Sequence, residues 1–521
     1  MNKLEFYRTH MIINDYNIGD CVKLEDCFRV YDPITHSYYC NGMDYNKETK
    51  QLRVPRGIDT FFVENLTQTR GVDKSDVFDD FATFEPLGLK YMPRDDKQVE
   101  TLQFMCGEGR YHRNKYLPQL SVNLATGKGK TYCSVATASY FGIRTIIITY
   151  STKWLTQWKD CIIEYTNIPK DRICMINGSS KIKRLMNNGC DYDFLLVTHS
   201  TLTSYAKNNG GYESIGQLFK ELKIGIKMYD EAHLCTESMY MIDFYTYTFK
   251  TYYITATPMR SNENENMIYQ YYMKNVPKID LFDENEDPHT HYIAIKYNSK
   301  PPIEVIGNCR NKYGLDRNKY TNYIVTNPNF YKILTIIMDH IMKHGGKTLM
   351  YIGTIEAMEI VYNWIITNYP QFAYNICMLN GYTEDKNIVN SNMIILSTTK
   401  SAGAAVDIKH LKRTVVLAEV FKSEVIARQS LGRTRDNNTE YIEVVDKGFK
   451  MIVNWFNYKK PVFSKYALSC KVINLTDRQL NEYYNNILAK IALYTTPPVY
   501  NYQPKVKILQ YPKRQMIKRL K

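Results

Sequence analysis

The sequence predicts an α/β protein in which two doubly wound parallel sheets follow one another along the chain. Apolar, β-branched runs recur through most of the chain, and such runs are typical of strands buried on both faces of a parallel sheet. The segments between the runs are long enough to hold the crossover helices that parallel strands require. A small β-rich N-terminal domain and a basic C-terminal extension are expected to flank the two sheets.

The first series of apolar runs predicts an α/β domain over residues 89–285. This domain ends in the acidic, proline-bounded stretch IDLFDENEDP. Its strands are expected at residues 143–150, 172–177, 193–199, 224–230 and 251–257.

A second series of the same kind predicts another α/β domain over residues 286–455. The C-terminal extension, residues 456–521, is Tyr- and Asn-rich and is expected to be helical to about residue 495. Its basic tail, KVKILQYPKRQMIKRLK, either contacts phosphates or is a solvated end. The strands of the second domain are expected at residues 347–353, 392–398, 413–419 and 439–446.

The N-terminal residues 1–88 predict a β-rich accessory domain that is a candidate for nucleic-acid contact. Short strand-like segments alternate with turns in this part of the chain. Phe28–Tyr31 precedes an Asp-Pro turn, and the strand-like QLRVPRG ends at Pro55 and Gly57.

Composition favours a globular protein with a polyanionic partner. Hydrophobic residues make up 44% and charged residues 23% of the 521 residues, which excludes global disorder. The net charge of +14 suits binding to a polyanion, although many other enzymes are mildly basic. The twelve cysteines include no CxxC pair, which argues against a zinc site or disulfide framework and favours a reducing cytoplasm. We find no apolar run near the ~20 residues of a membrane span and no signal-peptide core.

The strongest local motif is the glycine-rich segment LATGKGKT, which precedes a helical pattern. A turn of this kind directs backbone N–H groups at a phosphate, the lysine neutralises phosphate oxygens, and the hydroxyl of the threonine binds Mg²⁺. The strict P-loop pattern has glycine where Leu124 stands, so a glycine- and lysine-rich surface turn is the alternative. The candidate nucleotide-binding residues here are Thr126, Gly127, Lys128, Gly129, Lys130 and Thr131.

Two adjacent carboxylates follow the predicted strand 224–230. Asp230 and Glu231 stand at its carboxyl end, where parallel sheets bind ligands, and Ala232-His233 completes the segment. One acid can hold Mg²⁺ while its neighbour positions or deprotonates a water molecule. The alternative is a pair of acids that cap a helix.

Together these motifs resemble those of the superfamily 2 helicases, in particular the DEAH-box branch. The resemblance covers about residues 90–450 and implies two RecA-like P-loop domains with ATP and Mg²⁺ between them. It assigns adenine recognition to Gln98, and metal binding to Thr131 and Asp230. Further residues match its nucleic-acid and coupling motifs; these are Gln157 (beside Trp158, interpreted as core), Thr198, His233, Thr255 and Thr257.

In the second domain, the segment 397–408 resembles the fifth motif of that family, with Asp407 as its acid and Ala405 where glycine is usual. Gln429 and Arg433 match the QxxGR core of the sixth motif, so Arg433 is the expected arginine finger. Asp436 stands where the family has a second arginine, and Arg435 precedes it. The catalytic residues that the resemblance implies are Lys130, Asp230, Glu231, Gln429, Arg433 and Arg435.

The compact size and the β-rich N-terminus further resemble the UvsW-type phage helicases and the poxviral transcript-release helicase. This branch implies an ATP-dependent DNA helicase or translocase, acting on branched or duplex DNA in a host cytoplasm, with replication or recombination proteins as partners. DNA is favoured over RNA, and no membrane partner is expected. The alternatives are an RNA helicase or transcript-release factor, the motor of a restriction-type translocase, and a binding module with a decayed ATPase.

Overall fold

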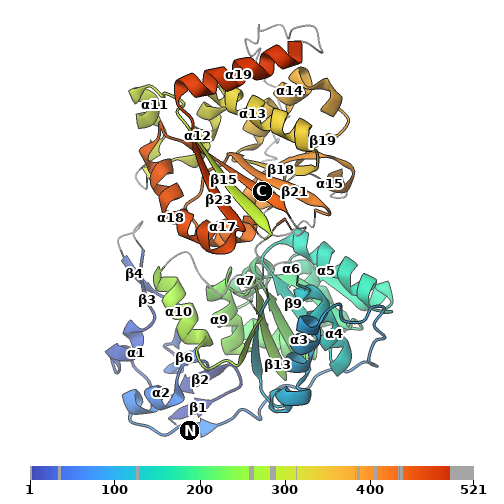
Figure 1. The fold of residues 1–521 in the computed structure, drawn as a ribbon. Helices are drawn as coiled ribbons and strands as arrows, with labels where there is room; N and C mark the ends of the chain where they lie inside the picture. The colour runs from blue at the N-terminus through green and yellow to red at the C-terminus, as the bar shows by residue number, and fades with distance from the viewer. Residues whose placement is uncertain are drawn as a thin grey trace, which may run out of the picture.

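The computed structural model has two lobes, one above the other in Figure 1, each built around a seven-stranded sheet. Every strand pairing within these two sheets is parallel, as predicted. The residues that the structure describes are 3–32, 37–124, 128–256, 263–281, 289–311, 314–381, 383, 388–402, 408–431, 433–434 and 438–492.

The first sheet has the strand order β10-β11-β9-β12-β13-β8-β14. Its strands are β8 (Gln119–Asn123), β9 (Thr145–Thr149), β10 (Ile173–Ile176), β11 (Phe194–Thr198), β12 (Ile226–Asp230), β13 (Lys250–Thr255) and β14 (Lys278–Asp280). Helices cover both of its faces, so the doubly wound architecture predicted for this domain is confirmed. These helices are α3 (Asp96–Cys106), α4 (Lys130–Phe141) and α5 (Thr152–Tyr165) on one face, and α6 (Ser179–Asn188), α7 (His199–Asn208), α8 (Glu213–Glu221) and α9 (Thr236–Tyr245) on the other.

The alternation of side chains along each strand explains the two apolar layers. Ile147 and Met228 point into the layer beneath α3, α4 and α5, whereas Ile146, Ile148 and Tyr229 point into the opposite layer. All five side chains are fully buried. A strand with apolar residues on both faces appears in the sequence as a continuous hydrophobic run, and the sequence shows this pattern.

The N-terminal region is a five-stranded mixed sheet that shares its core with the first lobe. Leu24, Val54, Tyr240 and Ile268 belong to one buried cluster, although the first two come from the N-terminal region and the others from the first lobe. At Gly57 a side chain would collide with the backbone, because an added Cβ would lie 1.5 Å from the carbonyl oxygen of Tyr272. The elements are β1 (Leu4–Phe6), β2 (His10–Ile13), α1 (Val22–Asp26), β5 (Asp44–Asn46), β6 (Gln51–Pro55), α2 (Thr60–Thr67) and β7 (Val72–Asp73), the separate hairpin β3 (Arg29–Asp32) with β4 (Ser37–Cys40), and α10 (Glu263–Met273) packed beside it.

The second sheet has the order β19-β20-β18-β21-β22-β15-β23, and its last strand corrects a predicted boundary. β23 (Ser469–Asn474) pairs with β15 (Thr290–Tyr297), so the second domain does not end at residue 455 but continues through α19 (Asp477–Ala492), which packs on α13 (Pro328–His344). The other strands are β18 (Lys347–Ile352), β19 (Ile376–Leu379), β20 (Ile394–Ser397), β21 (Leu411–Ala418) and β22 (Thr439–Asp446). The other longer helices are α12 (Arg317–Ile324), α14 (Ile355–Asn368), α17 (Glu424–Leu431) and α18 (Lys450–Tyr466).

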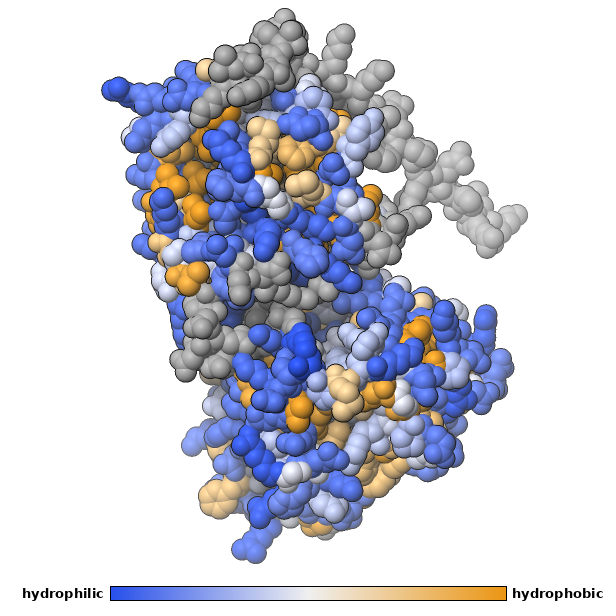
Figure 2. All heavy atoms as spheres, turned by 45° about the vertical axis from the view of Figure 1, so that its right-hand side comes forward, coloured by the Kyte–Doolittle hydropathy of each residue, from blue (hydrophilic) through white to orange (hydrophobic). Residues whose placement is uncertain are grey.

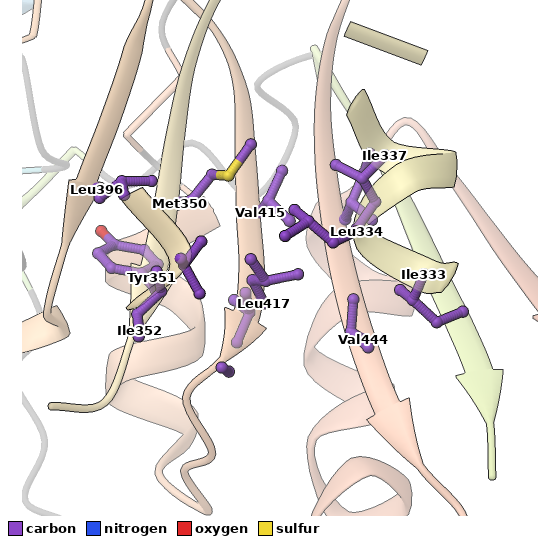
Figure 3. Packing of buried hydrophobic residues seen from close by; sticks show 14 of the residues in the cluster. Ile333, Leu334, Ile337, Met350, Tyr351, Ile352, Leu396, Val415, Leu417 and Val444 are labelled. Atoms are coloured by element: carbon purple, nitrogen blue, oxygen red, sulfur yellow. The ribbon is translucent and has the colours of Figure 1, made fainter. Parts of the chain in front are cut away.

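Helix α13 supplies much of the second core. Figure 3 shows its side chains beside those of the central strands, and they form one buried cluster. The labelled residues are Ile333, Leu334 and Ile337 on the helix, and Met350, Tyr351, Ile352, Leu396, Val415, Leu417 and Val444 on the strands.

One face of the molecule is mainly polar. On the face shown in Figure 2, hydrophilic residues dominate both lobes and hydrophobic residues appear in separate groups. Among the helices of the described ranges, none combines the length and the apolar character of a membrane span.

A buried ion pair lies beneath the strand that ends at Asp230. The ammonium of Lys227 on β12 lies 2.5 Å from Oδ1 of Asp243 on α9, and neither side chain is exposed to solvent. Tyr229 donates to the same carboxylate at 2.8 Å and Tyr253 at 2.6 Å, and Tyr272 of α10 donates to it as well. Burial lowers the pKa of Lys227, and the negative charge of Asp243 opposes that effect.

We predict that Asp243→Asn strongly destabilises the protein, because it leaves the Lys227 charge buried without its counter-charge. Loss of one partner of such a pair costs on the order of 3–5 kcal/mol in the free energy of unfolding. Urea unfolding followed by circular dichroism measures this change. Glu221→Gln, which alters an exposed carboxylate on α8, is the control and should change little. Equal stability of the two variants would contradict the prediction.

Candidate functional site

The candidate site lies at the carboxyl edge of the first sheet, where three neighbouring strands end. β12 ends at Asp230, β13 ends at Thr255, and β8 leads into the turn before α4. Because the three strands are parallel neighbours, their carboxyl ends meet at one edge, which is where open α/β sheets bind ligands. This edge faces the second lobe, since Lys153 at the start of α5 donates to the carbonyl of Asn380 at 3.4 Å.

The N-terminus of α4 has the geometry of an anion-binding site. Gly129 precedes the helix with φ +90°, a conformation that favours glycine, and it provides no side-chain cap for the first helical N–H groups. The Lys130 ammonium donates to the carbonyl of Leu124 at 3.3 Å, and Thr131 follows it in the first turn. Thr126 and Gly127 lie outside the described residues.

Gln98 is buried on α3 and contacts Lys128 and Gly129, the described residues just before α4. Its Oε1 accepts from the N–H of Arg94 at 2.8 Å, and its Nε2 donates to the carbonyl of Lys128 at 3.4 Å. A Cβ on Gly129 would lie 2.2 Å from that Nε2, so a side chain there would displace the Gln98 amide, and the φ of +90° also favours glycine. The amide that the sequence analysis assigns to adenine recognition is therefore engaged with two backbone groups of its own chain.

Glu231 is the acidic centre of the site. Its Oε1 lies 3.8 Å from the Lys130 ammonium, and its Oε2 accepts from the N–H of Ala256 at 3.5 Å. Burial alone would raise the pKa of this carboxyl, but electrostatic interactions with Lys130, His233 and Arg433 hold it below its usual value. Its φ of +50° is rare for a residue with a side chain, and such backbone conformations concentrate at functional sites.

Asp230 differs from its neighbour in both environment and pKa. Burial and the adjacent negative charge of Glu231 raise its pKa to about 6. The indole N–H of Trp158 donates to its Oδ2 at 2.8 Å and partly offsets that rise. Two adjacent carboxyls with pKa values moved in opposite directions are typical of sites that assign them different roles.

His233 and Thr255 connect Glu231 with the end of β13. The His233 Nδ1 lies 2.7 Å from the Thr255 hydroxyl and 3.5 Å from Glu231 Oε2, and both residues are buried. The Thr255 hydroxyl also donates to that oxygen at 3.5 Å. These two predicted coupling residues therefore belong to the cluster, whereas Thr257 lies outside the described residues.

Arg433 is the residue of the second lobe that acts on this cluster. It is buried, and its positive charge lowers the pKa of Glu231 from the opposite lobe. Gln429 lies on α17, but its side chain is outside the description, as are Arg435 and Asp407.

Two of the predicted nucleic-acid residues stand apart from the carboxylates. Thr198 at the end of β11 is fully buried and caps α7, because its hydroxyl accepts from the N–H of Thr201 at 3.2 Å. Gln157 is half-buried on α5. These positions lie on the elements that the resemblance names, and no contact that is described connects them with Glu231.

The hydrogen bond between Trp158 and Asp230 is a feature of the site that the sequence did not predict. The amphipathic pattern of α5 indicates a buried ring, and the ring is buried, with 3% exposed. The partner of its N–H depends on how α5 packs across the sheet. Only the identity of the residue, a tryptophan rather than Leu or Phe at a core position, could have hinted at a buried acceptor.

The donors present fit Mg²⁺ held together with phosphate groups. Among the described residues, no group of three or more His, Cys, Asp or Glu side chains is arranged to hold a metal by itself. Mg²⁺ typically takes one or two protein oxygen ligands and completes its shell with water and phosphate oxygens. Asp230 and the Thr131 hydroxyl are donors of that kind.

Sequence comparison matches the segment that carries the site. Residues 94–260 match the family model described as "Type III restriction enzyme, res subunit". A segment of 143 residues is 25% identical to Rad25 of Haloarcula marismortui, over 27% of this chain and 20% of that protein. A segment of 148 residues is 25% identical to the DNA 3'-5' helicase XPB of Kineococcus radiotolerans, over 28% of this chain and 25% of that protein. The matched segments thus span a quarter or less of these relatives.

Two solved structures are similar over most of the chain. The crystal structure of T4 UvsW aligns over 91% of this chain and 100% of its own, with 13% identity and a TM-score of 0.36. S. cerevisiae Dbp5 bound to RNA and ADP BeF3 aligns over 75% of this chain and 96% of its own, with 12% identity and a TM-score of 0.48.

We predict that Asp230→Asn makes the protein more stable at neutral pH. The pKa of Asp230 is higher in the folded than in the unfolded state, so its charge opposes folding above pH 6. This penalty shrinks as the pH falls through about 6, and it disappears only below the ordinary pKa of 3.8, where the carboxyl is protonated in both states. The gain at pH 7.5 should be roughly 1–3 kcal/mol. Urea unfolding of both proteins at pH 7.5 and pH 4 tests this, and a less stable variant at pH 7.5 would contradict it.

Proposed function

Because this chain is a member of helicase superfamily 2, we propose that it hydrolyses ATP with Mg²⁺ and uses that energy to move along nucleic acid. The observation that supports this most directly is the cluster at the sheet edge. A helix N-terminus, an ammonium, two carboxylates with opposite pKa shifts and an arginine from the facing lobe converge there. Phosphoryl transfer needs these groups, since its catalysis is mostly positioning and charge stabilisation.

Each residue of the cluster has a proposed role. The first N–H groups of α4 and the Lys130 ammonium bind the phosphates, together with the glycine-rich turn that contains Thr126, Gly127 and Lys128. Thr131 and Asp230 hold Mg²⁺, which, when bound, neutralises charge on the phosphoryl oxygens. Glu231 remains ionised at neutral pH because of its lowered pKa, so it can accept a hydrogen bond from a water molecule and orient it.

The facing lobe completes the site when the two lobes approach. Arg433 would stabilise the negative charge that develops on the transferred phosphoryl group, and Gln429 would help to position the water. Asp407 and Arg435 are proposed to assist from the same side. The hydrogen bonds from His233 and Thr255 provide a path from Glu231 to the end of β13, which continues to Thr257.

DNA, in branched or partly unwound form, is the substrate that we favour. One curated relative is named a DNA helicase, and the net charge of +14 suits contact with a phosphate backbone. The N-terminal sheet is fixed beside the motor and can contact duplex there. A phage origin belongs to the same proposal.

A restriction-type translocase is the second candidate, because the family model that matches residues 94–260 carries that description. Such a motor translocates on duplex DNA. A duplex preference without strand separation would therefore favour it over a helicase.

We predict that Lys130→Ala abolishes ATP hydrolysis but leaves nucleic-acid binding largely intact, because the phosphate and strand sites are separate. Glu231→Gln should bind ATP normally yet fail to turn over, since the amide cannot take a proton from water. Radiolabelled ATP hydrolysis and filter binding of both variants provide the measurement. Normal turnover in Lys130→Ala would remove the ATPase proposal.

We predict that Arg433→Ala lowers ATP turnover far more than ATP affinity, because its contact belongs to the closed state of the two lobes. Loss of an arginine finger can reduce the catalytic rate on the order of 10³-fold. Steady-state kinetics separate the two effects. Weaker ATP binding with little change in turnover would instead assign Arg433 a role in the ground state.

We predict that a synthetic DNA fork stimulates ATP hydrolysis more than matched single-stranded DNA or matched RNA. The comparison requires one salt concentration, because contacts with phosphates are strongly salt-dependent. Strand displacement on the same fork separates a helicase from a translocase. Strongest stimulation by RNA would overturn the DNA assignment and leave the motor assignment in place.

A further inference from the structure

The indole N–H of Trp158 forms a hydrogen bond with the carboxylate of Asp230 at the candidate site. The indole is 3% exposed, and its Nε1 donates to Oδ2 of Asp230 at 2.8 Å. A buried indole N–H needs an acceptor, and an ionised carboxylate makes that hydrogen bond both shorter and stronger than a neutral acceptor would. The bond therefore fixes the orientation of the carboxyl group as well as that of the ring.

Packing explains the ring of Trp158 but not this hydrogen bond. Trp154 lies one turn earlier on the same face of α5, is 6% exposed, and belongs to the same apolar layer. Its ring lies beside that of Tyr150, with centroids 6.0 Å apart. Both tryptophans belong to the apolar layer between α5 and the sheet, and the N–H of Trp158 donates to Asp230.

We propose that Trp158 is a positioning residue for Asp230: its N–H occupies Oδ2 and leaves Oδ1 directed toward the Mg²⁺ and phosphate side of the site. This inference rests on the proposed function, which assigns Asp230 to Mg²⁺. A group that orients a metal ligand in this way typically contributes strongly to metal affinity.

Helix α5, which carries Trp158, also contacts the second lobe. Near its N-terminus, Lys153 donates to the carbonyl of Asn380 in the second lobe. The helix also packs against α4, which carries Lys130. The same helix therefore contacts the facing lobe and orients the carboxylate of Asp230. A displacement of α5 relative to the sheet would change the Trp158–Asp230 hydrogen bond.

The test is the Mg²⁺ dependence of binding of a fluorescent ATP analogue, followed by anisotropy. Trp158→Phe keeps an aromatic ring but removes the donor, and it should raise the Mg²⁺ concentration at half-maximal binding roughly tenfold, against less than about twofold for Trp154→Phe. The Trp158→Phe change should have no further effect in an Asp230→Asn background, because the carboxylate that it orients is already gone. Similar midpoints for the two single tryptophan variants, or a full effect in that background, would overturn the inference.

Failure of the proposed function would look different. In that case, Asp230→Asn itself would leave the Mg²⁺ midpoint unchanged, and the inference about Trp158 would fail with it. A shifted midpoint in Asp230→Asn together with a normal one in Trp158→Phe rejects the positioning role alone.

A second measurement decides the question if Trp158→Phe does not fold. The chain has four tryptophans, so replacing Trp154, Trp364 and Trp455 by Phe leaves Trp158 as the single emitter. Its emission should shift when Mg²⁺ and ADP are added together, and Asp230→Asn should abolish the shift. If the emission maximum of Trp158 does not change on addition of Mg²⁺ and ADP while Asp230 is present, the inference is overturned.

Discussion

The buried charge of Asp243 is the constraint on which the first lobe depends. Its carboxylate lies under the sheet and receives the Lys227 ammonium together with the hydroxyls of Tyr229, Tyr253 and Tyr272. These donors come from β12, β13 and α10, so one acid fixes the two strands whose carboxyl ends form the site. A charge at such depth is tolerated only when every side of it is paired. The strand that is held from below by this network ends above it at Asp230.

The first lobe thus contains two kinds of buried acid, Asp243 on α9 and the Asp230–Glu231 pair at the end of β12, with opposite consequences. Asp243 faces donors that match its charge, whereas Asp230 and Glu231 repel each other at the open edge. Electrostatic interactions with Lys130, His233 and Arg433 lower the pKa of Glu231, and Arg433 belongs to the other lobe. Asp230 accepts the indole N–H of Trp158, and Lys130 also acts on it, yet its pKa stays raised. A functional site can retain a destabilising arrangement of charge at a cost in stability. The hydrogen-bonded network of Asp243 therefore lies under the strand that ends at this pair.

The sequence predicted the fold class, because strands buried on both faces leave continuous apolar runs, as at β9 and β12. It missed β8, where the buried polar side chain of Gln119 is satisfied by the Tyr253 hydroxyl and interrupts the apolar pattern. It also missed β23, an exposed edge strand without an apolar run, and so ended the second domain too early. Motif spacing named Lys130, Asp230 and Glu231, and the structure brings these residues together at the sheet edge. The pairing of Trp158 with Asp230 depends on helix packing across the sheet, which local sequence does not encode.

The N-terminal sheet and the first lobe have one apolar core between them, and this has a mechanical consequence. Two parts of a protein that share a core are not joined by a flexible linker, so the N-terminal sheet is rigidly attached to the first lobe. The close contact of Gly57 with the Tyr272 carbonyl tightens that attachment. When the two lobes move relative to each other, the N-terminal sheet moves together with the first lobe. A force applied to the N-terminal sheet therefore acts on the sheet of the first lobe as well.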